Sequence, residues 1–183
     1  MEIYMRKYLY IVFPTLIPYL SIGFVFLTLY TDFGAWLNDS GVIVPLALLI
    51  ALLLFAIFSF ISGAVSCIFM YKNKVCSRDS VKLALTLKVV HIPMHLCCAI
   101  LGWLLLIWMG LGLYFFAINF FAIATSGIIS AYAIIKSRTE GRISSISAVI
   151  RIFISFIFVI DVFFAIANYI TIRQSANKTS ASN

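Results

Sequence analysis

A stripe of polar and reactive side chains runs through one of the apolar segments of this sequence. Lys88, His91, His95, Cys98 and Gly102 are spaced by 3, 4, 3 and 4 residues, so on a helix they share one face. Imidazole groups can accept and release protons near neutral pH, and imidazole together with thiolate can bind zinc or copper. Because a polar stripe cannot face lipid at low cost, we expect it to face the interior of a helical bundle.

A carboxyl group lies in the middle of the last apolar segment. On a helix, Asp161 shares one face with Ala165 and Asn168. An ionised Asp at the centre of a span costs about 2.5 to 3.5 kcal/mol, but each surrounding Ile, Phe or Val returns about 0.3 to 0.6 kcal/mol, so the segment still inserts. Measured along each helix from its basic end, Asp161 and His95 lie at a similar depth in the membrane. The sequence therefore predicts an intramembrane polar layer of Lys88, His91, His95 and Asp161.

This layer admits three interpretations. In the first, Asp161 and a histidine form a buried pair that fixes the order of the helices, while small residues on two other segments form packing seams. Those seams are Ser59, Gly63 and Cys67 on one segment, and Ala122, Ser126 and Ser130 on the other. In the second, a proton or ion path runs through Asp161, His95 and His91.

The third interpretation is a metal site formed by His91, His95 and Cys98, which would present two nitrogen ligands and one sulfur ligand on one face. This spacing arises readily by chance. The zinc-protease motif would also require Glu after the first His, where this chain has Ile92. We therefore predict no bound metal ion and no cofactor.

The composition excludes a water-soluble domain. Of the 183 residues, 64% are hydrophobic and 10% are charged, and the mean hydropathy is +1.14. Soluble domains carry about 25% charged residues. Since a bilayer crossing takes about 20 apolar residues, a chain of this length suits four to six crossings.

The apolar segments predict an all-α fold, a polytopic transmembrane helical bundle of about five spans in one domain covering residues 1–173. The stretch 83–135 is apolar for about 53 residues, about 80 Å as one helix, so it must turn back, most naturally at Gly110–Gly112. The polar tail 174–183 is predicted to be disordered. The predicted spans are 8–31, 42–71, 84–109, 113–135 and 149–171.

The distribution of Lys and Arg predicts the orientation of the bundle. With the N-terminus in the cytoplasm, every Lys and Arg except Arg173 and Lys178 falls on the inner side, and the C-terminus lies outside. Those two residues are the exception to the rule. They leave an alternative open, in which four spans are accompanied by a re-entrant or surface-lying segment.

Two segments, KVVHIP at residues 88–93 and IFVIDV at residues 157–162, resemble a family of small multi-pass bacterial membrane proteins of unknown function. The resemblance covers about residues 83–170 and implies a bacterial plasma membrane, but it brings no activity, substrate or cofactor. After the proline, where the family would have a small residue and an aromatic one, this chain has Met94 and His95, so no role for His95 carries over. The implied motif positions are Lys88, His91, Pro93 and Asp161.

Catalysis and nucleic-acid binding find no support in the sequence. The net charge of +7 comes from Lys and Arg beside apolar runs, which is the pattern of membrane orientation rather than of a nucleic-acid surface. There is no nucleophile elbow, phosphate loop or pair of carboxylates. We therefore expect no enzyme activity, and a role in the bilayer as an accessory or partner subunit of a membrane complex. The alternative is a small transporter or an ion- or proton-conducting protein, acting as a homo-oligomer, that uses the Asp161 and histidine layer.

Overall fold

A computed structural model of the chain describes residues 2–30, 43–109, 112–157 and 160–181. All the regular structure in these ranges is helical, which confirms the all-α prediction. The helices are α1 (Glu2–Tyr30), α3 (Ile43–Lys72), α4 (Ser77–Met109), α5 (Gly112–Thr139), α6 (Ser145–Ile154) and α7 (Ile160–Ala181). The first four lie close to the predicted spans 8–31, 42–71, 84–109 and 113–135.

The chain is a membrane protein by the length and apolarity of its helices. Within the described residues, three stretches are long and apolar enough to cross a bilayer. They are Leu54–Lys72, Ser77–Leu104 and Gly112–Thr139. Large apolar side chains such as Ile57, Phe58 and Ile61 are exposed on the outside of the bundle, as expected where lipid is the solvent.

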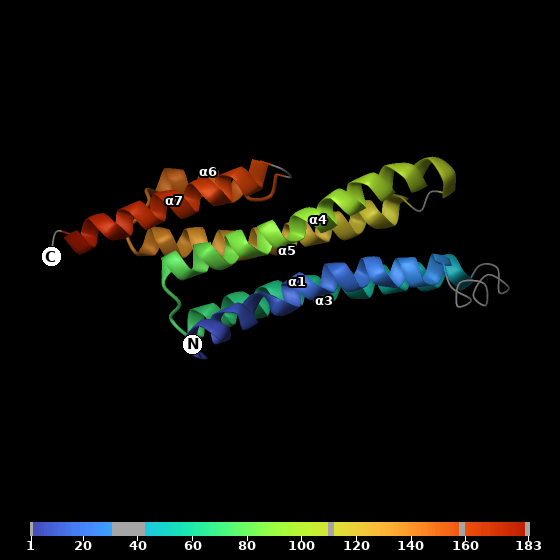
Figure 1. Cartoon of the computed structure of the whole chain (residues 1–183), viewed down its shortest axis with the longest axis horizontal. Helices are drawn as coiled ribbons and strands as arrows, with labels where there is room; N and C mark the ends of the chain where they lie inside the picture. The colour runs from blue at the N-terminus through green and yellow to red at the C-terminus, as the bar shows by residue number, and fades with distance from the viewer. Residues whose placement is uncertain (1, 31–42, 110–111, 158–159, 182–183) are drawn as a thin grey trace.

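The four long helices alternate in direction along the bundle (Figure 1). α4 packs most extensively on α5, α3 packs on α5 and α1, and α1 also contacts α4. One cluster of buried apolar side chains lies where α3, α4, α5 and α7 meet, and it includes Met70, Leu87, Ile129 and Ile172. A second cluster further along α4 and α5 contains Met94, Cys98, Phe115 and Ala122.

At one end of the bundle, α3 and α5 terminate in the same way. The N–H of Val75 donates to the Met70 carbonyl and that of Lys74 to the Tyr71 carbonyl, so Lys74, at φ 49°, holds the left-handed position that glycine usually takes. After α5 this position is held by Gly141, at φ 70°. These turns satisfy the last helical carbonyls and return the chain sharply into the next helix.

The predicted fifth span, residues 149–171, is not one helix. α6 ends at Ile154 and α7 begins at Ile160. The guanidinium of Arg151 in α6 donates to the amide oxygen of Asn168 in α7, although the two residues are 17 positions apart, about 25 Å on a continuous helix. The chain therefore reverses between them, and α6 and α7 form a helical hairpin.

This hairpin lies along α4 and α5, and α7 runs back toward the end of the bundle where α1 begins (Figure 1). The structure thus differs from the prediction that the last segment runs parallel to the 84–109 segment and ends on the opposite side. α7 also continues to Ala181, so most of the tail predicted to be disordered is helical.

Candidate functional site

The predicted polar stripe on α4 is buried inside the bundle. Lys88 is 2% exposed and His91 is 0% exposed, and His95 and Cys98 are buried as well. Gly102 is also buried, and the nearest atoms to a Cβ built on it belong to the ring of Phe116 on α5, at 3.2 Å. All five residues thus face inward, as the sequence interpretation requires.

Lys88 holds the tip of the hairpin. Its Nζ atom donates to the carbonyl oxygen of Ser155, at 3.2 Å. Ser155 is the C-cap of α6, and its own N–H points back to the carbonyls of the preceding turn. The unpaired carbonyls at a helix C-terminus carry partial negative charge, so the buried ammonium compensates this end of α6. Since Lys88 lies about 16 Å along α4 from Ser77, the tip of the hairpin is deep within the apolar part of the bundle.

A second basic group lies between the two arms of the hairpin. Arg151 donates through Nε to the hydroxyl of Ser147, at 2.8 Å, and through Nη1 to the amide oxygen of Asn168. Asn168 and Ala165 line a small cavity between α4, α5 and α7, together with Ser130. The buried hydroxyl of Ser130 has no hydrogen-bond partner among the described residues.

Asp161 belongs to the first turn of α7, but its side chain lies outside the described residues. The expected pairing of Asp161 with a histidine therefore stays a prediction. Its two companions on the predicted face, Ala165 and Asn168, are both buried.

His91 lies where α4 crosses α1. Its ring is against the backbone of Pro14 and Thr15, and the Tyr19 ring lies 6.4 Å away, centroid to centroid. Because Pro18 has no N–H, the carbonyl of Pro14 lacks its usual helical donor. Neither ring nitrogen of His91 has a hydrogen-bond partner among the described residues, although both are buried.

Two further contacts of this part of α4, one with α1 and one with α5, were not predicted from the sequence. The hydroxyl of Tyr19 donates to the carbonyl of Val90, at 2.5 Å. Nδ1 of His95 is hydrogen-bonded to the amide oxygen of Asn119 on α5. The only sequence signal for Asn119 is that a polar amide occurs inside the apolar segment 113–135. The histidines therefore connect α4 to helices on two sides.

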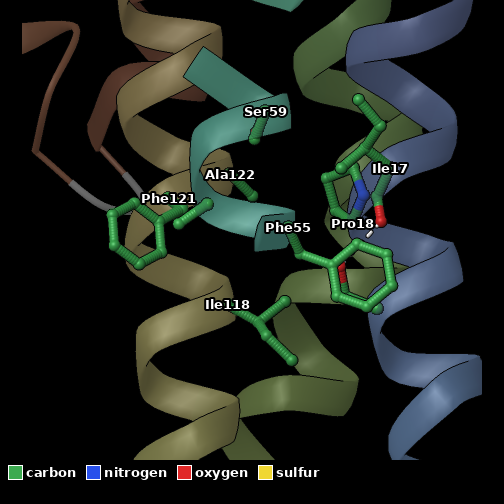
Figure 2. A pocket seen from close by; sticks show the side chains of 9 residues that line it. Ile17, Pro18, Phe55, Ser59, Ile118, Phe121 and Ala122 are labelled. Carbon is green, nitrogen blue, oxygen red and sulfur yellow. Dashed lines mark hydrogen bonds between the residues drawn. The ribbon is translucent and has the colours of Figure 1, made fainter. Parts of the chain in front are cut away.

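Three of the small residues expected to form packing seams, Ser59, Gly63 and Cys67 of α3, lie against α5, whereas Ser130 of the expected α5 seam lines the cavity beside α4 and α7. The hydroxyls of Ser59 and Thr125 are hydrogen-bonded at 2.7 Å, and a Cβ built on Gly63 would lie 3.0 Å from Cγ2 of Thr125. A small cavity nearby is bounded by α1, α3 and α5, with Pro18, Phe55 and Ser59 on its walls (Figure 2). Thr125, the partner in this seam, was not singled out by the sequence pattern.

The metal interpretation gains no support from the geometry. Across the described ranges, no group of three or more His, Cys, Asp or Glu side chains is arranged to hold a metal ion. His91, His95 and Cys98 share a stripe without forming such a group. The cysteines Cys67, Cys76, Cys97 and Cys98 are free thiols.

Fold and site together define an all-helical membrane protein in which a helical hairpin is docked against α4 and α5, with the buried ammonium of Lys88 at its tip. Comparison with protein-family models, curated proteins and solved structures finds no match for this chain. The resemblance of the segments 88–93 and 157–162 to a bacterial membrane family therefore remains an expectation.

Proposed function

We propose that this chain is a bacterial plasma-membrane protein that moves an ion past the tip of a re-entrant hairpin. The observation that carries this proposal is the reversal of the chain deep inside the bundle, marked by the hydrogen bonds of Lys88 with Ser155 and of Arg151 with Asn168.

In this proposal α1, α3, α4 and α5 cross the membrane, and α6 and α7 enter and leave on the inner side. The topology accounts for the two basic residues that did not fit a five-span arrangement. Arg173 and Lys178 belong to the second half of α7, which returns to the end of the bundle where α1 begins. Every Lys and Arg then belongs to the inner half of the protein, with the N-terminus and the C-terminus both cytoplasmic.

The hairpin tip supports transport for a physical reason. Non-helical backbone at membrane depth is tolerated only where protein buries it or where it lines a water-filled cavity. Transporters use the ends of such half-helices to bind ions, and ionisable side chains inside a membrane commonly mark the route. Here the C-terminus of α6, the N-terminus of α7 and the ammonium of Lys88 belong to one region.

Purified protein in lipid vesicles, loaded with pH-sensitive and ion-sensitive dyes, tests this function. We expect ion or proton flux above that of empty vesicles, and we expect Lys88→Met to abolish it. Lys82→Met is the matched control, because Lys82 is an exposed lysine on the same helix. Its flux should equal that of the wild type.

Wild-type flux equal to that of empty vesicles, across gradients of protons, alkali cations and halides, would contradict transport. The accessory role would then be the better explanation, provided that a stoichiometric membrane partner co-purifies with the chain from native membranes. Recovery of the chain as a homo-oligomer that conducts would support the transport proposal.

A further inference from the structure

The two histidines of this chain form a pair that connects three helices. His91 and His95 are the only histidines in the sequence, and they lie on successive turns of α4. Their ring centroids are 5.8 Å apart and their planes are nearly perpendicular, at 83°. His91 faces the backbone of α1 at Pro14, while His95 is bonded to Asn119 of α5.

His91 is the incomplete member of this pair. It is 0% exposed, and both ring nitrogens lack a partner among the described residues. Leaving a buried polar group unpaired costs about 1–3 kcal/mol. The carbonyl of Pro14, deprived of its helical donor by Pro18, is an acceptor next to the ring.

Hydrogen bonding sets the chemistry of His95. With the amide oxygen of Asn119 as acceptor, Nδ1 of His95 carries a hydrogen, and in the neutral ring Nε2 then carries the lone pair. A protonated His91 has two N–H donors. The Pro14 carbonyl is an acceptor for one of them, and the His95 ring lies one turn away, with its centroid 5.8 Å from that of His91.

We infer that His91 and His95 form a two-histidine site that binds a single proton inside the bundle. The proton adds to the lone pair of the His91 ring, and transfer of one N–H hydrogen to Nε2 of His95 regenerates neutral His91. Only N–H bonds form and break in this step. The proton is then the ion of the proposed function. Only the flux of protons rests on that function; proton binding by the two histidines does not.

Neighbouring charges limit the site to one proton. Lys88 lies one turn before His91 on the same stripe, and a second proton would place three positive charges on successive turns. The other titratable neighbours are Tyr19 on α1 and Cys98 on α4, while α5 contributes the neutral amide of Asn119. On α7 the titratable residue near the tip is Asp161, whose side chain lies outside the described residues.

Nitrogen-15 NMR of the full chain, labelled at histidine and embedded in lipid, tests this inference directly, because only two rings contribute signals. We expect both rings to titrate together, with a total uptake of one proton. His95→Leu should lower the proton affinity of His91 about tenfold, because its acceptor is lost.

Pro18→Ala offers a second, independent readout. It restores an N–H donor to the Pro14 carbonyl, so that carbonyl stabilises the protonated ring less, and we again expect about tenfold weaker proton binding. Pro45→Ala, in the first turn of α3, is the matched proline control and should leave the titration unchanged.

The inference would be overturned if both histidine rings stayed neutral at every pH at which the protein is folded, even if vesicles conduct another ion. So would two rings that titrate independently, each with a full proton. Coupled uptake of one proton by a chain that carries no flux would support the site while contradicting the proposed function.

Discussion

The Nζ atom of Lys88 donates to the carbonyl oxygen of Ser155 across 3.2 Å, joining residues that are 67 positions apart. Both residues are buried, at 2% and 4% exposure. The bond brings a cation to the C-terminus of α6, where it interacts favourably with the helix dipole. A hairpin that reverses within an apolar bundle needs protein partners for the polar groups at its tip, and this contact provides one of them.

Replacing Lys88 with methionine should loosen the hairpin tip without unfolding the bundle. A hydrogen bond to a charged group contributes about 1.5–3 kcal/mol. Methionine, however, removes the cost of burying an ammonium, which offsets the loss in global stability. We expect amide hydrogen exchange at residues 155–157 to become at least about tenfold faster, with little change in the melting temperature. Unchanged exchange at the tip would contradict the role assigned to Lys88, and Lys82→Met serves as the control.

The bond between Arg151 and Asn168 makes the reversal of the chain measurable. In a chain whose native cysteines are replaced by alanine, cysteines at 151 and 168 should react with a short bifunctional maleimide to give an internal crosslink. Cysteines at 151 and 174 form the control pair, because Gln174 lies about 9 Å further along α7. Crosslinking at neither pair would favour one continuous helix, in which residues 151 and 168 are about 25 Å apart.

The positions of α1, α3, α4 and α5 and the inward direction of the α4 stripe could be predicted because apolar length and helical periodicity are local signals. The reversal after Ile154 could not. Residues 155–160 contain neither Gly nor Pro and are as apolar as the flanking helices. The contacts that hold the chain there come from residues distant in sequence: Lys88 donates to the carbonyl of Ser155, and Phe156 packs on Gly127. Asn119 and Thr125 were missed for the same reason, since their partners lie on other helices.

Gly127 provides space for the hairpin tip. A Cβ built on this residue would lie 2.5 Å from Cε1 of Phe156, so the aromatic ring packs directly on the glycine. Gly127→Ala should therefore lower the free energy of unfolding by about 1–3 kcal/mol, the usual cost of overpacking, less the gain of about 1 kcal/mol in helix propensity. Thermal unfolding in detergent measures the difference. At Gly23 a Cβ meets nothing within 4 Å, so Gly23→Ala is the matched control and should be neutral or stabilising. Equal stabilisation by both substitutions would show that Phe156 does not pack on Gly127.

Glu140, which directly follows α5, holds the start of α4. Its carboxylate accepts from the backbone N–H of Ser77 at 3.0 Å and from the Ser77 hydroxyl at 2.5 Å, and thereby caps the start of α4. Burial alone would raise the pKa of Glu140. The hydrogen bonds from Ser77 and the neighbouring Arg142 outweigh that effect and hold the pKa below its usual value of 4.5.

The lowered pKa of Glu140 fixes the direction of a pH effect. A carboxylate whose pKa is lower in the folded state stabilises the fold above its unfolded pKa, and this contribution is lost as the pH falls through the folded value. Glu140→Gln should therefore lower the free energy of unfolding by about 1 kcal/mol at pH 7, the usual contribution of a helix cap, and by progressively less in acid. Thermal unfolding of wild type and variant between neutral and acidic pH measures this convergence. In a double-mutant cycle with Ser77→Ala, the double variant should lose less free energy of unfolding than the sum of the two single losses, because each substitution removes the same contact. Additive losses with no dependence on pH would show that the carboxylate does not cap α4.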